Sequence, residues 1–133
     1  MVVSSRRRTL SSMLVAPLLA AAALAGAPVT LTTADNGRTV PVHRGAVVVV
    51  KLASNPTTGF GWHLVKPLDP RVLRLVSHRY APSSTSPPLG AGGFETWRFV
   101  ARGAGRARLA LAYFRSWEPK NVVRRFTVGL RVS

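Results

Sequence analysis

The sequence predicts an all-β domain, specifically an immunoglobulin-like antiparallel β-sandwich of about 7–8 strands. Three observations support this fold class. From Val29 onward no window places apolar residues at i, i+3, i+4 and i+7 over three turns, so helices are not expected. Short β-branched runs with an alternation of period two occur instead. Clusters of Gly, Pro and Asn separate these runs at the close spacing typical of a sandwich of about 100 residues.

The first half of the predicted sandwich holds four strands. Val29–Thr33 is followed by Asp35-Asn36-Gly37, which indicates a hairpin turn because Asn-Gly accepts positive φ, and Thr39–Val42 is the expected return strand. Ala46–Ala53 contains four consecutive valines, which predicts a strand buried on both faces or nearly so. Trp62–Val65 is the fourth strand.

The second half adds strands over Val72–Tyr80, Phe94–Ala101, Arg106–Tyr113 and Val122–Val132, and Ala81–Gly93 is a Pro/Ser-rich loop that is not expected to pair well. The last two strands alternate clearly. Their expected inward residues are Ala107, Leu109, Leu111, Tyr113, Phe126, Val128, Leu130 and Val132. Trp62 and Trp97 lie within strand patterns and are expected in the core.

The N-terminal segment has the order of a secretory signal peptide. Arg6-Arg7-Arg8 is a basic region, Met13–Ala25 is an apolar run too short for a typical membrane span, and small residues close it. The sequence therefore predicts a signal peptide over residues 1–27, cleaved after Ala25 or Ala27, and an exported domain over 28–133. An uncleaved anchor is the alternative. In both cases the domain is expected to be secreted or to lie in the periplasm or cell envelope.

Composition argues against an enzyme. The chain of 133 residues is 47% hydrophobic, enough for a core, but it has only four Asp and Glu and no Cys. The absence of Cys excludes a thiol nucleophile, disulfides and Cys-ligated metals. The three His lack metal-ligand spacing, so neither a metal nor another cofactor is expected. With 19 Lys and Arg the formal charge is +15, and removal of three leader arginines would leave +12.

Three loops break the strand pattern, and binding residues concentrate on such loops. In the first, Asn55-Pro56-Thr57-Thr58-Gly59-Phe60, the proline forces Asn55 into an extended conformation and Gly59 lets the chain turn back. The Asn55 side chain can bond the loop backbone, which would hold two threonines at a stiff apex. An ordinary β-turn is the alternative for this segment.

The other two loops are rich in glycine and in interface residues. Leu89-Gly90-Ala91-Gly92-Gly93 permits close backbone approach, although a flexible linker is the alternative. The third loop, Tyr113-Phe114-Arg115-Ser116-Trp117-Glu118-Pro119, has an Arg and a Trp beyond the end of an alternating strand, and exposed Trp and Arg are enriched at interface hot spots. The alternative for Trp117 is a hydrophobic lid over the end of the sandwich.

Together these loops resemble the chagasin family of cysteine-protease inhibitors, peptidase inhibitor family I42. Members share an Asn-Pro-Thr-Thr-Gly-aromatic loop, a Gly-x-Gly-Gly loop and an Arg-Pro-Trp loop, in that order, on an immunoglobulin-like sandwich. This chain has Asn55 to Phe60, Gly90 to Gly93 and Arg115 to Trp117 in the same order. Arg125-Phe126-Thr127-Val128 also resembles the family's last strand. The resemblance runs from about Thr32 to the C-terminus, and Ser116 departs from it by standing where the family usually has proline.

The resemblance implies a monomeric, reversible and noncovalent inhibitor whose three loops wedge into the cleft of a papain-like protease. Thr57 would lie over the catalytic Cys–His pair, with Thr58 and Gly59 beside it. The second and third loops would contact the two walls of the cleft, with Trp117 as the anchor. Because proline restricts chain freedom, Ser116 predicts a somewhat looser third loop and weaker, not abolished, binding.

The charge supports an alternative function, a basic extracytoplasmic module that binds an anionic polymer. Nucleic acid is not an expected partner, because aromatic side chains do not interleave with the basic ones as a stacking platform requires. A simpler interpretation of the positive charge is that it keeps an exported domain soluble without binding a polymer. The footprint of the alternative would be Arg98, Arg102, Arg106, Arg108, Arg124, Arg125 and Arg131.

Overall fold

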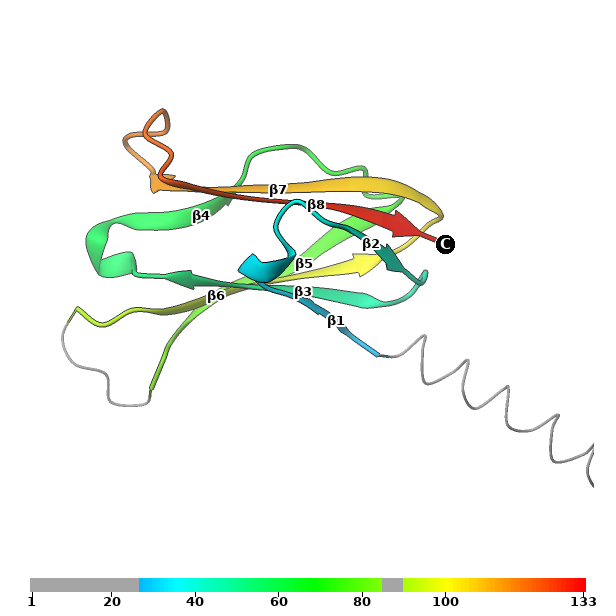
Figure 1. The fold of residues 1–133 in the computed structure, drawn as a ribbon, viewed down its shortest axis with the longest axis horizontal. Coiled ribbons are helices and arrows are strands. Elements are labelled where there is room, and N and C mark those ends of the chain that lie inside the picture. Colours follow the sequence, from blue (N-terminus) through cyan, green and yellow to red (C-terminus); the bar gives the residue numbers. More distant parts are fainter. Residues whose placement is uncertain (1–26, 85–89) are drawn as a thin grey trace, which may run out of the picture.

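The computed structural model describes residues 27–84 and 90–133, and these form two packed β-sheets (Figure 1). Residues 1–26 of the predicted signal peptide and Leu89 of the second loop lie outside the described residues. No helix among the described residues has the length and apolarity needed to cross a membrane. The elements, in order, are β1 (Val29–Leu31), the 3₁₀ helix η1 (Thr33–Asp35), β2 (Thr39–Val42), β3 (Val47–Ser54), the 3₁₀ helix η2 (Pro56–Thr58), β4 (Phe60–Leu64), β5 (Leu73–Pro82), β6 (Gly93–Ala101), β7 (Gly105–Arg115) and β8 (Arg124–Val132).

Each sheet has four strands. Sheet A has the order β1-β3-β6-β5, and sheet B has the order β2-β8-β7-β4. The long strand pairs are antiparallel, whereas the short edge strands β1 and β2 run parallel to β3 and β8. The predicted β-sandwich is confirmed, with the difference that these two edge pairs are parallel.

The core lies between the two sheets and follows the period-two pattern. On β8 the inward residues Phe126, Val128, Leu130 and Val132 are buried, as the alternation predicts. Trp62 and Trp97 are also buried, which confirms the expectation that they are core residues. The valine run of β3 is buried from Val48 to Val50, and alternation resumes at Lys51, so only part of this strand is covered on both faces.

The predicted hairpin at Asp35-Asn36-Gly37 is wrong. The strands on either side of it, β1 and β2, belong to different sheets, so this segment crosses from one sheet to the other. The side-chain Oδ1 of Asn36 accepts a hydrogen bond of 2.8 Å from the backbone N–H of Thr127, and the Gly37 N–H donates to the Thr127 carbonyl. The Asn-Gly pair therefore attaches the crossover to β8, and bonds to a distant strand override the local turn preference.

The Pro/Ser-rich loop is also shorter than expected. Ala81 and Pro82 continue β5 and pair with Phe94 and Gly93 of β6. A proline is compatible with this place because β5 is an edge strand and Pro82 is its last residue.

Candidate functional site

The three loops singled out in the sequence lie together at one end of the sandwich, at the left in Figure 1. The first connects β3 to β4, the second leads into β6, and the third follows β7. The predicted binding residues that the structure describes are Asn55, Pro56, Thr57, Thr58, Gly59, Phe60, Gly90, Ala91, Gly92, Gly93, Arg115, Ser116 and Trp117. Three of them belong to strands and not to loops, because backbone pairing extends β4 to Phe60, β6 to Gly93 and β7 to Arg115. Strands from both sheets therefore position the site.

The first loop is one turn of 3₁₀ helix with an asparagine cap. Asn55 is extended, with φ −135° and ψ 91°, and its Oδ1 accepts hydrogen bonds from the backbone N–H of Thr57 and from the Thr57 hydroxyl, at 3.2 and 2.6 Å. Gly59 ends the turn in the left-handed region with φ +84°. Pro56, Thr57 and Thr58 are exposed, so the expected stiff apex with two threonines is present.

Asn55 also joins the first loop to its surroundings. Its side-chain Nδ2 donates a 2.8 Å hydrogen bond to the Gly90 carbonyl of the second loop. Its backbone N–H donates to the Tyr113 hydroxyl at 2.9 Å. Gly92 of the second loop lies against the backbone of Ser54. A Cβ added at Gly92 would be only 3.0 Å from the Ser54 carbonyl oxygen, so this position favours glycine. Asn55 thus links the first loop by hydrogen bonds both to the second loop and to strand β7 of sheet B.

The third loop packs against the first from the other side. Nε of Arg115 donates a 3.0 Å hydrogen bond to the Thr58 carbonyl, and its guanidinium lies 4.4 Å from the centre of the Phe60 ring. The Trp117 indole covers Gly59 although 67% of the tryptophan surface is exposed. Trp117 is therefore the most exposed of the large hydrophobic side chains in the described chain and not a lid over the core.

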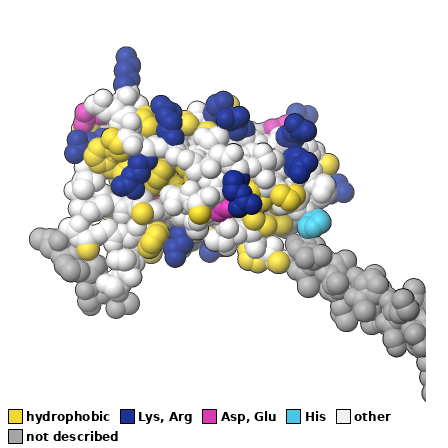
Figure 2. Space-filling model, in the orientation of Figure 1, with side chains coloured by type: hydrophobic (Ala, Val, Ile, Leu, Met, Phe, Trp, Pro, Cys, Tyr) yellow, Lys and Arg dark blue, Asp and Glu magenta, His cyan; other side chains and the backbone are white. Residues whose placement is uncertain are grey.

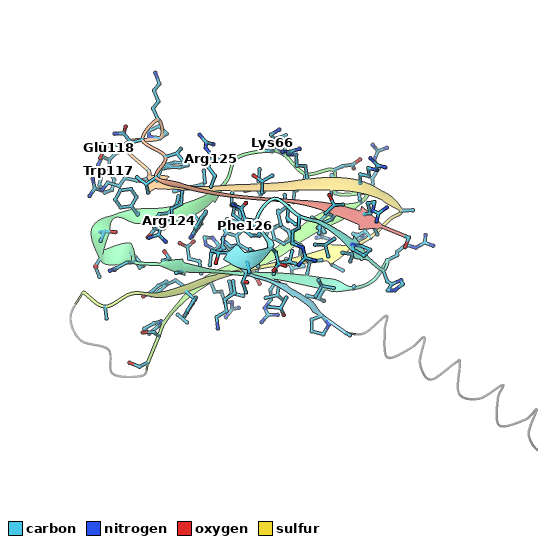
Figure 3. All side chains as sticks on the ribbon, in the orientation of Figure 1. Lys66, Trp117, Glu118, Arg124, Arg125 and Phe126 are labelled. Atoms are coloured by element: carbon cyan, nitrogen blue, oxygen red, sulfur yellow. The ribbon has the colours of Figure 1, made fainter. Side chains whose placement is uncertain are left out.

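Glu118 fastens the third loop internally. Its Oε2 accepts a 2.9 Å hydrogen bond from the side chain of Asn121, and its Oε1 pairs with Arg115 at 3.3 Å. The Asn121 hydrogen bond, followed by that of Arg115, lowers the pKa of Glu118 below its ordinary value, so the carboxylate stays ionised at neutral and mildly acidic pH. Figure 3 shows Trp117 and Glu118 side by side at this end of the molecule.

A buried carboxylate supports the base of the first loop. Glu95 of β6 is only 5% exposed, and its Oε2 accepts hydrogen bonds from the Ser54 hydroxyl at 2.5 Å and from the Trp62 N–H at 3.0 Å. Its Oε1 lies 2.5 Å from Nε2 of His78, whose ring stacks on Trp97. Ser54 and Trp62 flank the first loop on β3 and β4, so this cluster fixes both of its stems.

The sequence prediction did not include three residues that shape the site. Tyr113 is expected on an inward strand face and at the start of the third loop, and Glu118 lies in that loop, but neither of them nor Glu95 is a predicted binding residue. A signal exists for Tyr113 and Glu95, because a buried Tyr hydroxyl and a carboxylate inside an apolar strand both require hydrogen-bond partners. The partners of Tyr113 and Glu95 lie on segments far apart in the chain, so the sequence alone could not supply them, whereas Glu118 bonds Arg115 and Asn121 within its own loop.

Gly59→Ala tests how the third loop rests on the first. A Cβ on Gly59 would clash with the Trp117 indole, lying 3.1 Å from Cζ2 and closer still to Cη2. At the same positive φ, Gly37 has nothing within 4 Å, so Gly37→Ala is a matched control. We expect both variants to lose about 1–2 kcal/mol of stability from backbone strain. Only Gly59→Ala should also lose protein-binding affinity, by about tenfold, because it displaces Trp117. Isothermal titration calorimetry measures the affinity of each variant for a protein partner. Equal affinities of Gly59→Ala and Gly37→Ala would show that the contact between Trp117 and Gly59 is not needed for binding.

Comparisons with known proteins agree with this architecture. The family model described as "Chagasin family peptidase inhibitor I42" matches residues 41–132. Chagasin from Trypanosoma cruzi is 37% identical over 107 residues, which is 77% of this chain and 96% of that protein.

Solved structures show the same similarity. The structure titled "Leishmania mexicana ICP" has a TM-score of 0.54 and 31% identity, covering 74% of this chain and 90% of the other. The cysteine protease inhibitor EhICP2 from Entamoeba histolytica has a TM-score of 0.67 over 80% of this chain and 95% of the other; at 19% identity this similarity concerns the fold.

Proposed function

The chain belongs to the chagasin family of peptidase inhibitors, and from that premise we propose that it inhibits papain-like cysteine proteases with its three clustered loops. Membership in an inhibitor family agrees with the sequence-based expectation that the chain is not an enzyme. Thr57 and Thr58 at the exposed apex would enter the active-site cleft, and the second and third loops would contact its walls. Because the chain has no Cys and the hydroxyls of Thr57 and Thr58 are engaged within the loop, the inhibition is noncovalent and reversible.

The main support for the proposal is that hydrogen bonds join the three loops to one another before any partner binds. Asn55 bonds Gly90, and Arg115 bonds Thr58, so the wedge is already assembled in the free protein. Ordering a loop during association costs affinity, and a preassembled surface avoids much of that cost. An interface of about 800 Å² per partner would then suffice for tight binding by one monomer.

The hydrogen bonds of the first loop also explain why a protease would not cut it. Cleavage needs a carbonyl that lies in line with the thiolate and is open to the oxyanion donors. The carbonyl of Asn55 accepts from the Thr58 N–H and hydroxyl, that of Pro56 from the Gly59 N–H, and that of Thr58 from Arg115. Three carbonyls of the loop are therefore turned toward internal donors, and the closed turn opposes the extended geometry of a substrate.

Export of the domain is part of the proposal. The basic, apolar and small-residue order of residues 1–27 supports a signal peptide, which would place the domain over 28–133 outside the cytoplasm. N-terminal sequencing of the protein recovered from the culture medium or envelope fraction would test both the location and the cleavage site.

The direct test is titration of the domain from Gly26 onward against papain. We expect stoichiometric inhibition that is reversed on dilution and is weakened about tenfold or more by Thr57→Arg, which places a long charged chain at the apex. Thr30→Arg makes the same change at an exposed position of β1 and should inhibit like the wild type. Failure of the wild type against papain and a second papain-like enzyme at micromolar concentration would refute the proposal.

Restoring the family proline should tighten binding. Ser116 is the second residue of a turn closed by a 2.8 Å hydrogen bond from the Glu118 N–H to the Arg115 carbonyl, a position that favours proline. We expect Ser116→Pro to gain about 0.4–1 kcal/mol from reduced chain freedom, which is roughly a two- to fivefold lower inhibition constant. Ser116→Ala removes the hydroxyl without fixing φ and should change little. A similar gain from both variants would assign the effect to the hydroxyl instead.

A further inference from the structure

The structure separates the arginines of the sequence-based footprint onto different surfaces. Arg98 lies on the outer face of sheet A, and Arg124 lies over the Tyr113 ring. Four others share the outer face of sheet B, and all of them are exposed. Arg125 lies six residues along β8 from Arg131, whereas Arg106 and Arg108 on β7 and Arg131 on β8 adjoin one another in the register. We call Arg106, Arg108 and Arg131 the arginine cluster. Figure 2 shows that Lys and Arg side chains far outnumber Asp and Glu on the visible face of the molecule.

The arginine cluster is an unfavourable arrangement unless an anion neutralises it. Arg106 and Arg131 are directly opposite in the β7–β8 register, where two like charges destabilise a sheet. All four acidic side chains of the chain are engaged elsewhere: Asp35 with Arg38, Asp69 with Arg71, Glu95 with His78 and Glu118 with Arg115. Among the described residues the cluster therefore has no carboxylate side chain as a partner.

The surface around the cluster is hollowed. A depression of about 570 Å³ is lined by the three arginines together with Thr39 and Gly129. The residue opposite Arg108 in the β7–β8 register is Gly129, which has no side chain, and the Thr39 side chain of β2 lies beside it. A second depression of about 460 Å³ also contains Arg106 and Arg131 and reaches Ser133 at the end of the chain. No acidic or aromatic residue of the described chain lines either depression.

We propose that the arginine cluster is a second binding site, specific for a linear polysaccharide that carries sulfate or phosphate groups. Guanidinium groups bind such oxyanions through paired hydrogen bonds, and three of them beside two adjoining depressions fit successive groups of one polymer. Single-stranded nucleic acid fits less well, because no aromatic side chain of the described chain lines either depression for base stacking. A second copy of this basic chain would bring like charges together.

The proposed site is independent of the inhibitory loops. Arg106 is near the start of β7 and Arg115 is its last residue, about 30 Å further along the strand. In Figure 1 the C-terminus, two residues beyond Arg131, lies at the opposite end of the sandwich from the loops. A polymer bound at the cluster would hold the inhibitor on an anionic surface while the three loops remain free for a protease.

The test is titration with a heparin-derived octasaccharide and, in a second arm, with phosphomannan, which together distinguish sulfate from phosphate. We expect the triple variant Arg106→Gln, Arg108→Gln, Arg131→Gln to bind its preferred polymer at least about tenfold more weakly than the wild type. Its slope of log affinity against log salt should fall by about two, since each lost phosphate-type contact contributes roughly 0.7–0.9. The control variant Arg74→Gln, Arg79→Gln, Arg98→Gln removes the same charge from the exposed face of sheet A and should bind like the wild type.

Thermal unfolding establishes that both triple variants are folded, and the sheet B variant should melt no lower than the wild type because a like-charge pair is removed. Three results would overturn the proposal. The first is an equal loss in both triple variants, which would reduce the effect to net charge. The second is no binding of either polymer at low salt. The third is equally tight, cluster-dependent binding of a DNA oligonucleotide of matched charge, which would replace the polysaccharide by nucleic acid.

Discussion

Trp117→Ala is expected to weaken protease inhibition by about 2–4 kcal/mol, which corresponds to roughly 30- to 1,000-fold in the inhibition constant. The physical reason is twofold. Trp117 is 67% exposed in the free protein, so its large ring has apolar surface to bury in a complex. The same ring also covers Gly59, so its removal opens the packing between the first and third loops. Steady-state inhibition of papain measures the loss.

The stability of the domain provides the control for this substitution. Because little of Trp117 is buried in the free protein, its removal should leave the midpoint of thermal unfolding nearly unchanged. Val76→Ala, which trims another exposed hydrophobic residue on β5 of sheet A, should alter neither inhibition nor stability. If Trp117→Ala inhibited papain as well as Val76→Ala does, Trp117 would not be the anchor of the interface.

Glu95→Ala is expected to cause the largest loss of stability, about 3 kcal/mol. Truncation leaves the Ser54 hydroxyl and the backbone N–H of Trp62 without an acceptor in a buried site. Each buried unsatisfied group costs about 1–3 kcal/mol of stability. For a domain of about 100 residues this corresponds to a fall of more than about 10 °C in Tm. Differential scanning calorimetry measures the change.

A matched variant separates the hydrogen bonds of Glu95 from its volume. Glu95→Gln keeps the shape and one acceptor oxygen, which can serve both Ser54 and Trp62, so its loss should remain below about 1.5 kcal/mol. Equal destabilisation by alanine and glutamine would mean that the negative charge beside His78, and not the acceptor geometry, supports the loop.

Local patterns were sufficient to predict much of the fold. The alternation in β7 and β8 predicted their inward residues, and the composition of the three loops predicted which segments leave the sheets. These predictions succeed because a strand exposes alternate side chains to opposite faces, so one face must be apolar when it is buried. The left-handed conformation of Gly59 and the extended conformation of Asn55 follow equally from single-residue sterics.

Local patterns gave wrong predictions where hydrogen bonds to a distant strand compete with the local turn or loop preference. Asp35-Asn36-Gly37 has the composition of a hairpin turn, yet hydrogen bonds with Thr127 make it a crossover between sheets. Pro82 suggested a loop, but its place at the end of an edge strand permits pairing with Gly93. In both cases the decisive partner is distant in the chain, and nothing in the local sequence identifies it.

Most strands, the exposed loops and the excess of positive charge thus follow from the sequence, since they depend on side-chain type, backbone sterics and period. The contacts between those parts come from the three-dimensional fold. It brought Asn55 to Gly90 and Tyr113, Arg115 to Thr58, and Arg106 to Arg131. The physical reason is that hydrogen bonds act over a few ångströms and charge repulsion at physiological salt over about 10 Å, so their energies depend on which residues the sheet register places side by side.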